Sequence, residues 1–248
     1  MNTSNPALMS NTFSGFGSIA QSDAMTVRGT VNKTAILLLL VLLPAAYVWN
    51  LFNASGQNPA SVATWMWAGL IGGLVLSMVT IFKKNWAPLS APLYAVMEGL
   101  FLGGLSVQFQ KAYPGIVMQA VSLSLATLLM MLAAYQSGWI RPSERFKLGI
   151  VAATGGIMVV YLVAIVLGFF GINVSFIQGN GLFSILFSGF VCIIAALNFI
   201  LDFDFIQQGA RSNVPKYMEW YGAFALMVTL VWLYIEILRL LAKLNSRR

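Results

Sequence analysis

Two carboxylates lie inside an apolar run towards the C-terminal end of the sequence. Asp202 and Asp204 are surrounded by Leu, Phe and Ile between residues 197 and 206. An ionised Asp at the centre of a bilayer costs about 2.5–3.5 kcal/mol, so acids kept there are candidates for function. Carboxylate oxygens are hard ligands that suit Ca²⁺, and they also bind protons. We therefore interpret Asp202 and Asp204 as candidate pH-sensing and ion-binding residues, with Ca²⁺ as the metal that they would hold.

The spacing of the polar residues in this run separates the two acids. Asp202 follows Asn198 by four residues, so both side chains share one face of a helix. Asp204 is two residues further on and faces elsewhere. We predict that Asp202 points into a helix bundle with Asn198 as a supporting polar group. Asp204 is expected nearer the cytoplasmic water, where it either attracts cations or is a simple interfacial carboxylate.

Three further acids lie in or beside apolar segments. Glu98 has no basic residue within one helical turn, so its partner must be another helix, water or a proton. Glu236 precedes Arg239 by three residues, a spacing that predicts an ion pair within one helix. Glu219 stands at the start of the last apolar segment, where a carboxylate suits the helix dipole. Glu98 and Glu236 are also kept as candidate pH-sensing or ion-binding residues, beside structural roles for each.

Acids on different helices could act together. Two carboxylates that meet across helices would share a proton, and their titration would be coupled. Protonation would let them hydrogen-bond and close the bundle, and deprotonation would make them repel and loosen it. Such a pair is a plausible pH-sensitive latch.

The composition places these acids in a membrane protein. The 248 residues are 59% hydrophobic and 8% charged, whereas soluble domains are roughly 25% charged. The basic residues lie between apolar runs, which favours a membrane topology signal over nucleic-acid binding. The chain has no His, which excludes Ser-His dyads and His-ligated zinc, and its single cysteine, Cys192, excludes a CxxC pair. With no nucleotide-binding or hydrolase motif either, we predict that the protein is not an enzyme and needs no cofactor besides the Ca²⁺ it could bind or carry.

The apolar runs predict an all-α bundle of seven transmembrane helices, because backbone groups in lipid must be bonded internally. We expect the helices at Thr34–Phe52, Ser61–Phe82, Leu89–Phe109, Ile116–Gln136, Leu148–Phe170, Leu182–Leu201 and Trp220–Leu241. Residues 1–33 read as a polar cytoplasmic tail and residues 34–248 as the transmembrane domain. Gly99 and Gly103 in the third segment predict close contacts between helices.

Orientation follows from the basic residues. With a cytoplasmic N-terminus, one side of the membrane carries Lys or Arg in every loop, and the opposite loops carry Lys111 alone. Seven spans would place the C-terminal residues outside, together with the basic side chains of Arg239, Lys243 and Arg247. Either this basic tail is exported, or one segment is re-entrant and six helices cross; we adopt seven.

Three stretches of the sequence resemble the bacterial branch of the Bax inhibitor-1-like family, also called the transmembrane Bax inhibitor motif family. They run from Tyr94 to Ser106, from Asn198 to Ile206, and from Lys216 to Tyr221. The resemblance implies a bundle whose last helix is surrounded by the other six, and a pH-dependent calcium leak. It also implies a sensor in which an Asp on the sixth helix, similar in position to Asp202, pairs with an Asp on the seventh.

The sequence departs from that sensor. The second aspartate would be expected near Leu226 or Met227, and no acid is found there. Glu98, Asp204 or Glu236 would then take its place, or this branch leaks differently or not at all.

These observations lead to one functional prediction and one alternative. The first is a pH-sensitive Ca²⁺ leak channel in the bacterial inner membrane, in contact with lipid and with Ca²⁺ or protons. The alternative is a non-transporting regulator that binds another membrane protein, such as a protease. An intramembrane aspartyl enzyme is disfavoured, because Asp202 and Asp204 lie on different faces of one helix.

Overall fold

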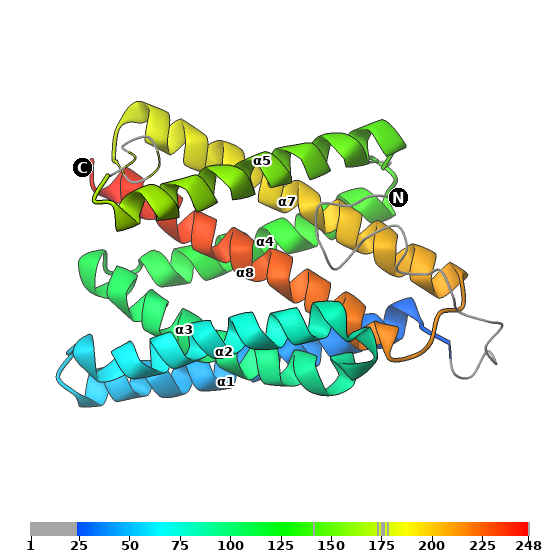
Figure 1. Cartoon of the computed structure of the whole chain (residues 1–248), viewed down its shortest axis with the longest axis horizontal. Coiled ribbons are helices and arrows are strands. Elements are labelled where there is room, and N and C mark those ends of the chain that lie inside the picture. The colour runs from blue at the N-terminus through cyan, green and yellow to red at the C-terminus, as the bar shows by residue number, and fades with distance from the viewer. Residues whose placement is uncertain (1–23, 141, 173, 175–176, 178, 248) are drawn as a thin grey trace. The chain divides into compact units, whose positions relative to one another are not determined.

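The computed structural model describes residues 24–140, 142–172, 174, 177 and 179–247, and this part of the chain is helical (Figure 1). The helices are α1 (Val27–Ala54), α2 (Ala60–Phe82), the short 3-10 helix η4 (Lys84–Trp86), α3 (Ala87–Ala112), α4 (Ile116–Gln136), α5 (Glu144–Phe169), α7 (Leu182–Arg211) and α8 (Met218–Asn245). Seven of the helical segments are long and apolar enough to cross a membrane. The predicted all-α bundle of seven spans is therefore confirmed.

Most predicted spans agree with the observed helices, and Ile116–Gln136 agrees at both ends. The largest differences are in α1 and α7, which extend well beyond the predicted spans. α1 begins at Val27, inside the stretch predicted as a tail, because the Thr26 side chain caps it by accepting a hydrogen bond from Gly29 N at 2.9 Å. α7 continues beyond Leu201 to Arg211, so Asp202 and Asp204 lie within the helix rather than after it. Residues 1–23 of the predicted tail lie outside the described residues.

The last helix is one of the most buried spans. In the most apolar 18-residue stretch of α8, 67% of the residues are buried, as in α3, against 17–22% in α1, α2, α4 and α5. The apolar side chains of α8 are thus mostly covered by protein. Those of α1, α2, α4 and α5 are mostly uncovered and available to lipid.

The chain forms two compact units. Among the described residues, unit 2 holds α1, α2, α3, the end of α7 from Phe205, and α8 up to Val228. In this unit α3 packs against α1 and α2, and Val48, Phe52, Val62, Leu100 and Val107 form a buried apolar cluster. Unit 1 holds α4, α5, α7 up to Asp204 and α8 from Thr229. Its apolar cluster consists of Ile157, Val191 and Ile194 with Tyr161 and Trp232 beside them.

Glycines allow the close approach of α1 to α3 in unit 2, as the sequence predicted. A Cβ atom added at Gly99 would lie 2.3 Å from the carbonyl oxygen of Val41, and one at Gly103 would lie 2.9 Å from the Cα of Ala45. Both obstacles are backbone atoms, which cannot swing away as a side chain can.

Replacing Gly99 with Ala is therefore expected to force α1 and α3 apart. Overpacking a tight contact costs about 1–3 kcal/mol, so thermal unfolding in detergent should begin at a lower temperature. Gly155→Ala in α5 is the matched control, since a Cβ there meets nothing within 4 Å. Equal unfolding temperatures for the two variants would contradict the close packing at Gly99.

Candidate functional site

Asp202 is a buried carboxylate whose bonding capacity is not used. It lies in α7, is 1% exposed, and neither of its oxygens has a hydrogen-bond partner among the described residues. Thr229 of α8 lies beside it, close enough to interact with the carboxylate, and is itself 3% exposed. A buried polar group without a partner costs free energy, so its retention indicates a ligand or a proton.

Asn198 lies one turn from Asp202 and is also buried, at 5% exposure. Its side-chain amide donates to Thr154 Oγ1 of α5 at 2.9 Å and to the carbonyl oxygen of Ile194 at 2.8 Å. Both residues lie within α7, four residues apart, so they share a helix face as predicted. The amide ties α7 to α5, which positions the turn that carries Asp202.

Asp204 has a different environment from Asp202. Its carboxylate binds the Nζ atom of Lys147 at 2.7 Å, and Lys147 also binds Glu144 at 3.1 Å. The Asp204 side chain is 17% exposed, which fits its predicted position nearer water. Within the described part of the chain, no group of three His, Cys, Asp or Glu side chains could hold a metal ion. A Ca²⁺ site built from Asp202 and Asp204 stays a prediction.

Glu236 is buried and held by several donors in unit 1. Tyr161 of α5 donates its hydroxyl to Glu236 Oε2 at 2.9 Å, and Arg239 Nη1 donates to Oε1 at 3.3 Å. The Arg239 guanidinium also lies over the Tyr161 ring, 5.5 Å from its centre. The ion pair predicted from the spacing of Glu236 and Arg239 is thus confirmed. Both carboxylate oxygens of Glu236 accept a hydrogen bond, in contrast to those of Asp202.

Glu98 is the buried acid of unit 2, at 8% exposure. It hydrogen-bonds to Tyr94, one helical turn earlier in α3. A Cβ at Gly73 of α2 would lie 3.0 Å from Glu98 Oε2, so the α2 backbone comes close to the carboxylate. The Tyr94 ring in turn makes an edge-to-face contact with Phe224 of α8, with ring centres 5.0 Å apart. The partner of Glu98 therefore comes from its own helix.

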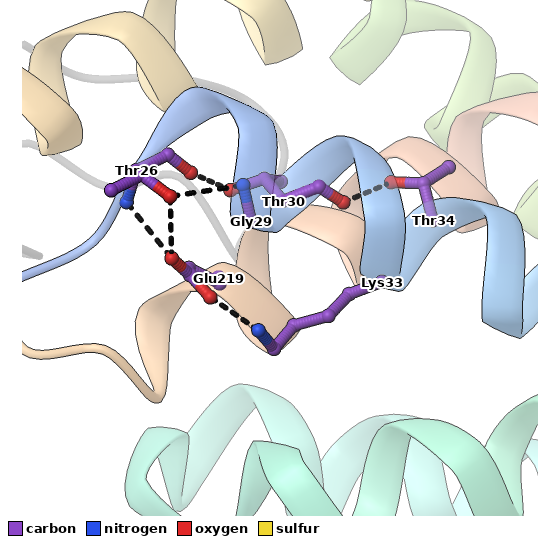
Figure 2. Close-up of polar contacts among 6 residues, drawn as sticks. All are labelled: Thr26, Gly29, Thr30, Lys33, Thr34 and Glu219. Atoms are coloured by element: carbon purple, nitrogen blue, oxygen red, sulfur yellow. Dashed lines mark hydrogen bonds and ion pairs between the residues drawn. The ribbon is translucent and has the colours of Figure 1, made fainter.

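Glu219 joins two helices of unit 2 (Figure 2). It lies in the first turn of α8, as predicted, but its carboxylate binds the start of α1. Thr26 donates its backbone N–H at 3.0 Å and its hydroxyl at 2.8 Å to Glu219 Oε1, and Lys33 forms an ion pair with Oε2. The side chain of Glu219 is 1% exposed and that of Lys33 is 18% exposed. Besides its predicted place in the first turn of α8, Glu219 therefore also binds the start of α1, which the sequence did not predict.

Gly29 provides the space for this contact. A Cβ at Gly29 would lie 2.1 Å from Glu219 Oε1, so a side chain there would displace the carboxylate. Together, Thr26, Gly29 and Glu219 place a negative charge at the N-terminus of α1, where the helix dipole favours it.

A comparison with known protein families finds a match over most of this chain. The model of the family described as Bax inhibitor 1 like matches residues 5–246, nearly the whole chain. The chain belongs to the Bax inhibitor 1 like family. No curated protein and no solved structure was found to match it.

The position opposite Asp202 is occupied by a hydroxyl in this Bax inhibitor 1 like protein. The sequence placed the partner of Asp202 near Leu226 or Met227, one turn earlier in α8. Both residues are buried apolar side chains of unit 2, and Thr229 is the residue beside Asp202. The second aspartate that the resemblance implies is therefore not found at Leu226 or Met227, and the described residue beside Asp202 carries a hydroxyl.

The sequence predicted Arg239 as a partner of Glu236 but missed other partners of the acids in this family member. Lys147 was placed in a loop, but α5 begins at Glu144 and so includes it. Tyr94 is four residues before Glu98, a spacing that could have revealed the contact. Tyr161 and Lys33 lie on other helices than their carboxylates, and no local pattern identifies them.

Proposed function

We propose that this integral membrane protein is a pH-sensitive cation leak that carries Ca²⁺ across the bacterial cytoplasmic membrane, with its N-terminal side in the cytoplasm. The observation that carries the proposal is Asp202, a carboxylate buried in a membrane span without a hydrogen-bond partner among the described residues. The resemblance to the Bax inhibitor-1-like family implies such an activity. The basic loops support the orientation.

Asp202 gives the proposed leak its pH dependence. An ionised carboxylate in this site attracts a cation, and Thr229 offers a hydroxyl oxygen as a second ligand. A protonated Asp202 is neutral and donates its proton to that same hydroxyl oxygen, which removes the attraction. Cation flux should therefore rise with pH. The carboxylates of Glu98 and Glu236 each accept a hydrogen bond from a tyrosine hydroxyl, and we assign them structural roles.

The test is Ca²⁺ entry into proteoliposomes between about pH 5 and pH 8, a range in which buried carboxylates can titrate. We expect flux that increases with pH in the wild type and that becomes small and independent of pH in Asp202→Asn. Glu98→Gln should retain the pH dependence, because its carboxylate already has a donor.

Glu144→Gln is the matched control for the change of an acid to its amide, since the Glu144 side chain is 65% exposed. It should behave like the wild type. Flux equal to that of empty vesicles at every pH would contradict the leak. The non-transporting regulator stays a prediction that such a result would favour, and crosslinking in membranes would then search for its protein partner.

A further inference from the structure

Polar residues recur at intervals of seven on α5 and α8 of unit 1, and at an interval of fourteen on α7. Seven residues make about two turns of an α-helix, so each series lies on one helix face, with about 10.5 Å between successive members. The series are Lys147, Thr154 and Tyr161 on α5, Asp202 and Ser188 on α7 with Ala195 between them, and Thr229, Glu236 and Lys243 on α8.

The three series meet in layers, which we call the polar seam. The first layer contains Asp202 and Thr229, with the Asn198–Thr154 hydrogen bond beside them. The second contains Glu236 and Tyr161, whose oxygens are 2.9 Å apart. The middle position of the α7 series is the fully buried Ala195, which has no polar side chain. The third contains Lys243 and Ser188, with Nζ and Oγ 2.7 Å apart.

Lys243 closes the third layer with a positive charge. It is 9% exposed, and its ammonium donates to the carbonyl oxygen of Ile177 at 2.7 Å and to that of Ser184 at 3.3 Å, besides Ser188. All three acceptors are neutral. No carboxylate lies within 4.0 Å of its ammonium in the described part of the chain.

The charge of the polar seam thus changes sign along its length. Among the described residues, Asp202 supplies a negative charge with no cation in contact, and Lys243 supplies a positive charge with no anion in contact. The other charged members are paired, Glu236 with Arg239, and Lys147 with Glu144 and Asp204. A cation drawn to Asp202 meets increasing repulsion towards Lys243. In a medium of low dielectric constant this repulsion grows in proportion to the charge of the ion.

We propose that the polar seam is the cation route of the leak and that Lys243 is the residue that closes its far end and limits the passage of divalent ions. This inference rests on the proposed function and adds to it a selectivity-determining residue. The ammonium holds its place through the serine hydroxyl and the two carbonyl groups, so its removal opens the route without touching Asp202.

The experiment compares Ca²⁺ and K⁺ flux in proteoliposomes for the wild type, Lys243→Gln and Lys243→Arg. The glutamine amide is neutral and can still donate to the same acceptors, whereas arginine keeps the charge. We expect Lys243→Gln to raise Ca²⁺ flux about tenfold and K⁺ flux less, because the barrier scales with ion charge. Lys243→Arg should remain at the wild-type level.

A second variant covers the case in which changes at Lys243 prevent folding. Ser188→Asp keeps the ammonium and neutralises it in place, and should also raise the ratio of Ca²⁺ to K⁺ flux. Lys111→Gln is the control for loss of an exposed lysine. An equal rise in the leakage of a neutral dye would overturn the proposal, since it would indicate a damaged bundle.

The outcomes separate this inference from the function on which it rests. Wild-type flux that depends on Asp202 but is unchanged in Lys243→Gln and Ser188→Asp would overturn the role of Lys243 alone. Absence of flux in the wild type and in every variant would overturn the leak and the route together.

Discussion

Glu219→Gln is expected to lower the free energy of unfolding by about 3 kcal/mol, the lower end of the range for breaking a buried ion pair from one side. The amide keeps the size of the side chain and still accepts from Thr26, but it leaves the ammonium of Lys33 without its counter-charge. Lys33 is 18% exposed, which is why the lower end of that range applies. Thermal unfolding in detergent measures the loss.

Two comparisons identify the ion pair as the cause. Glu144→Gln removes a carboxylate that is 65% exposed, and surface pairs contribute about 0–1 kcal/mol, so its unfolding temperature should change little. In the double variant Lys33→Met/Glu219→Gln no charge is left unpaired, and part of the stability should return. The single variant Lys33→Met completes the comparison. If the stability lost in the double variant equals the sum of the losses in Lys33→Met and Glu219→Gln, the contact shown in Figure 2 does not act as a pair.

Thr229→Asp should make stability strongly dependent on pH. At about pH 5 a shared proton would join the new carboxylate to Asp202 and give its oxygens a partner. At higher pH both carboxylates would ionise, and two charges about 4 Å apart repel by about 4 kcal/mol at an effective dielectric constant of 20. The variant is therefore expected to lose about 3–4 kcal/mol of stability between pH 5 and pH 8.

Thr229→Asn is the matched control, since the asparagine side chain has nearly the same shape as that of aspartate but carries no charge. Thermal unfolding of both variants across this pH range gives the comparison. Parallel profiles for the two would show that residue 229 does not face Asp202, and the structural basis of the proposed site would then fail.

The sequence predicted the spans and the buried acids because both depend on local composition. A run of apolar residues must be helical in lipid, and an acid within such a run is visible at once. The spacing of Glu236 and Arg239 predicted a contact for the same reason, since residues three apart on a helix are neighbours. The start of α1 was misplaced because hydrophobicity marks where a helix enters lipid. The helix itself begins earlier, at the cap formed by Thr26.

The partners of the acids depend on how helices pack, which one sequence does not reveal. Glu219 and Lys33 are 186 residues apart, and Tyr161 and Glu236 are 75 apart. The resemblance to a family implied a partner for Asp202 on α8, but Thr229 is found beside Asp202 only when α7 and α8 are placed together. The search of the sequence for charged residues could not find Thr229, because its hydroxyl carries no charge.

The link between Glu219 and the start of α1 bears on the order of assembly during synthesis. Ribosomes deliver helices from the N-terminal end, so Lys33 enters the membrane region long before Glu219 has been made. Until α8 inserts, the first helix lacks the carboxylate that caps it and pairs with its lysine. Unit 2 contains the first three helices together with residues 205–228. The part of the protein that is translated first is consequently among the last to be completed, because Lys33 gains its counter-charge only when α8 has been made.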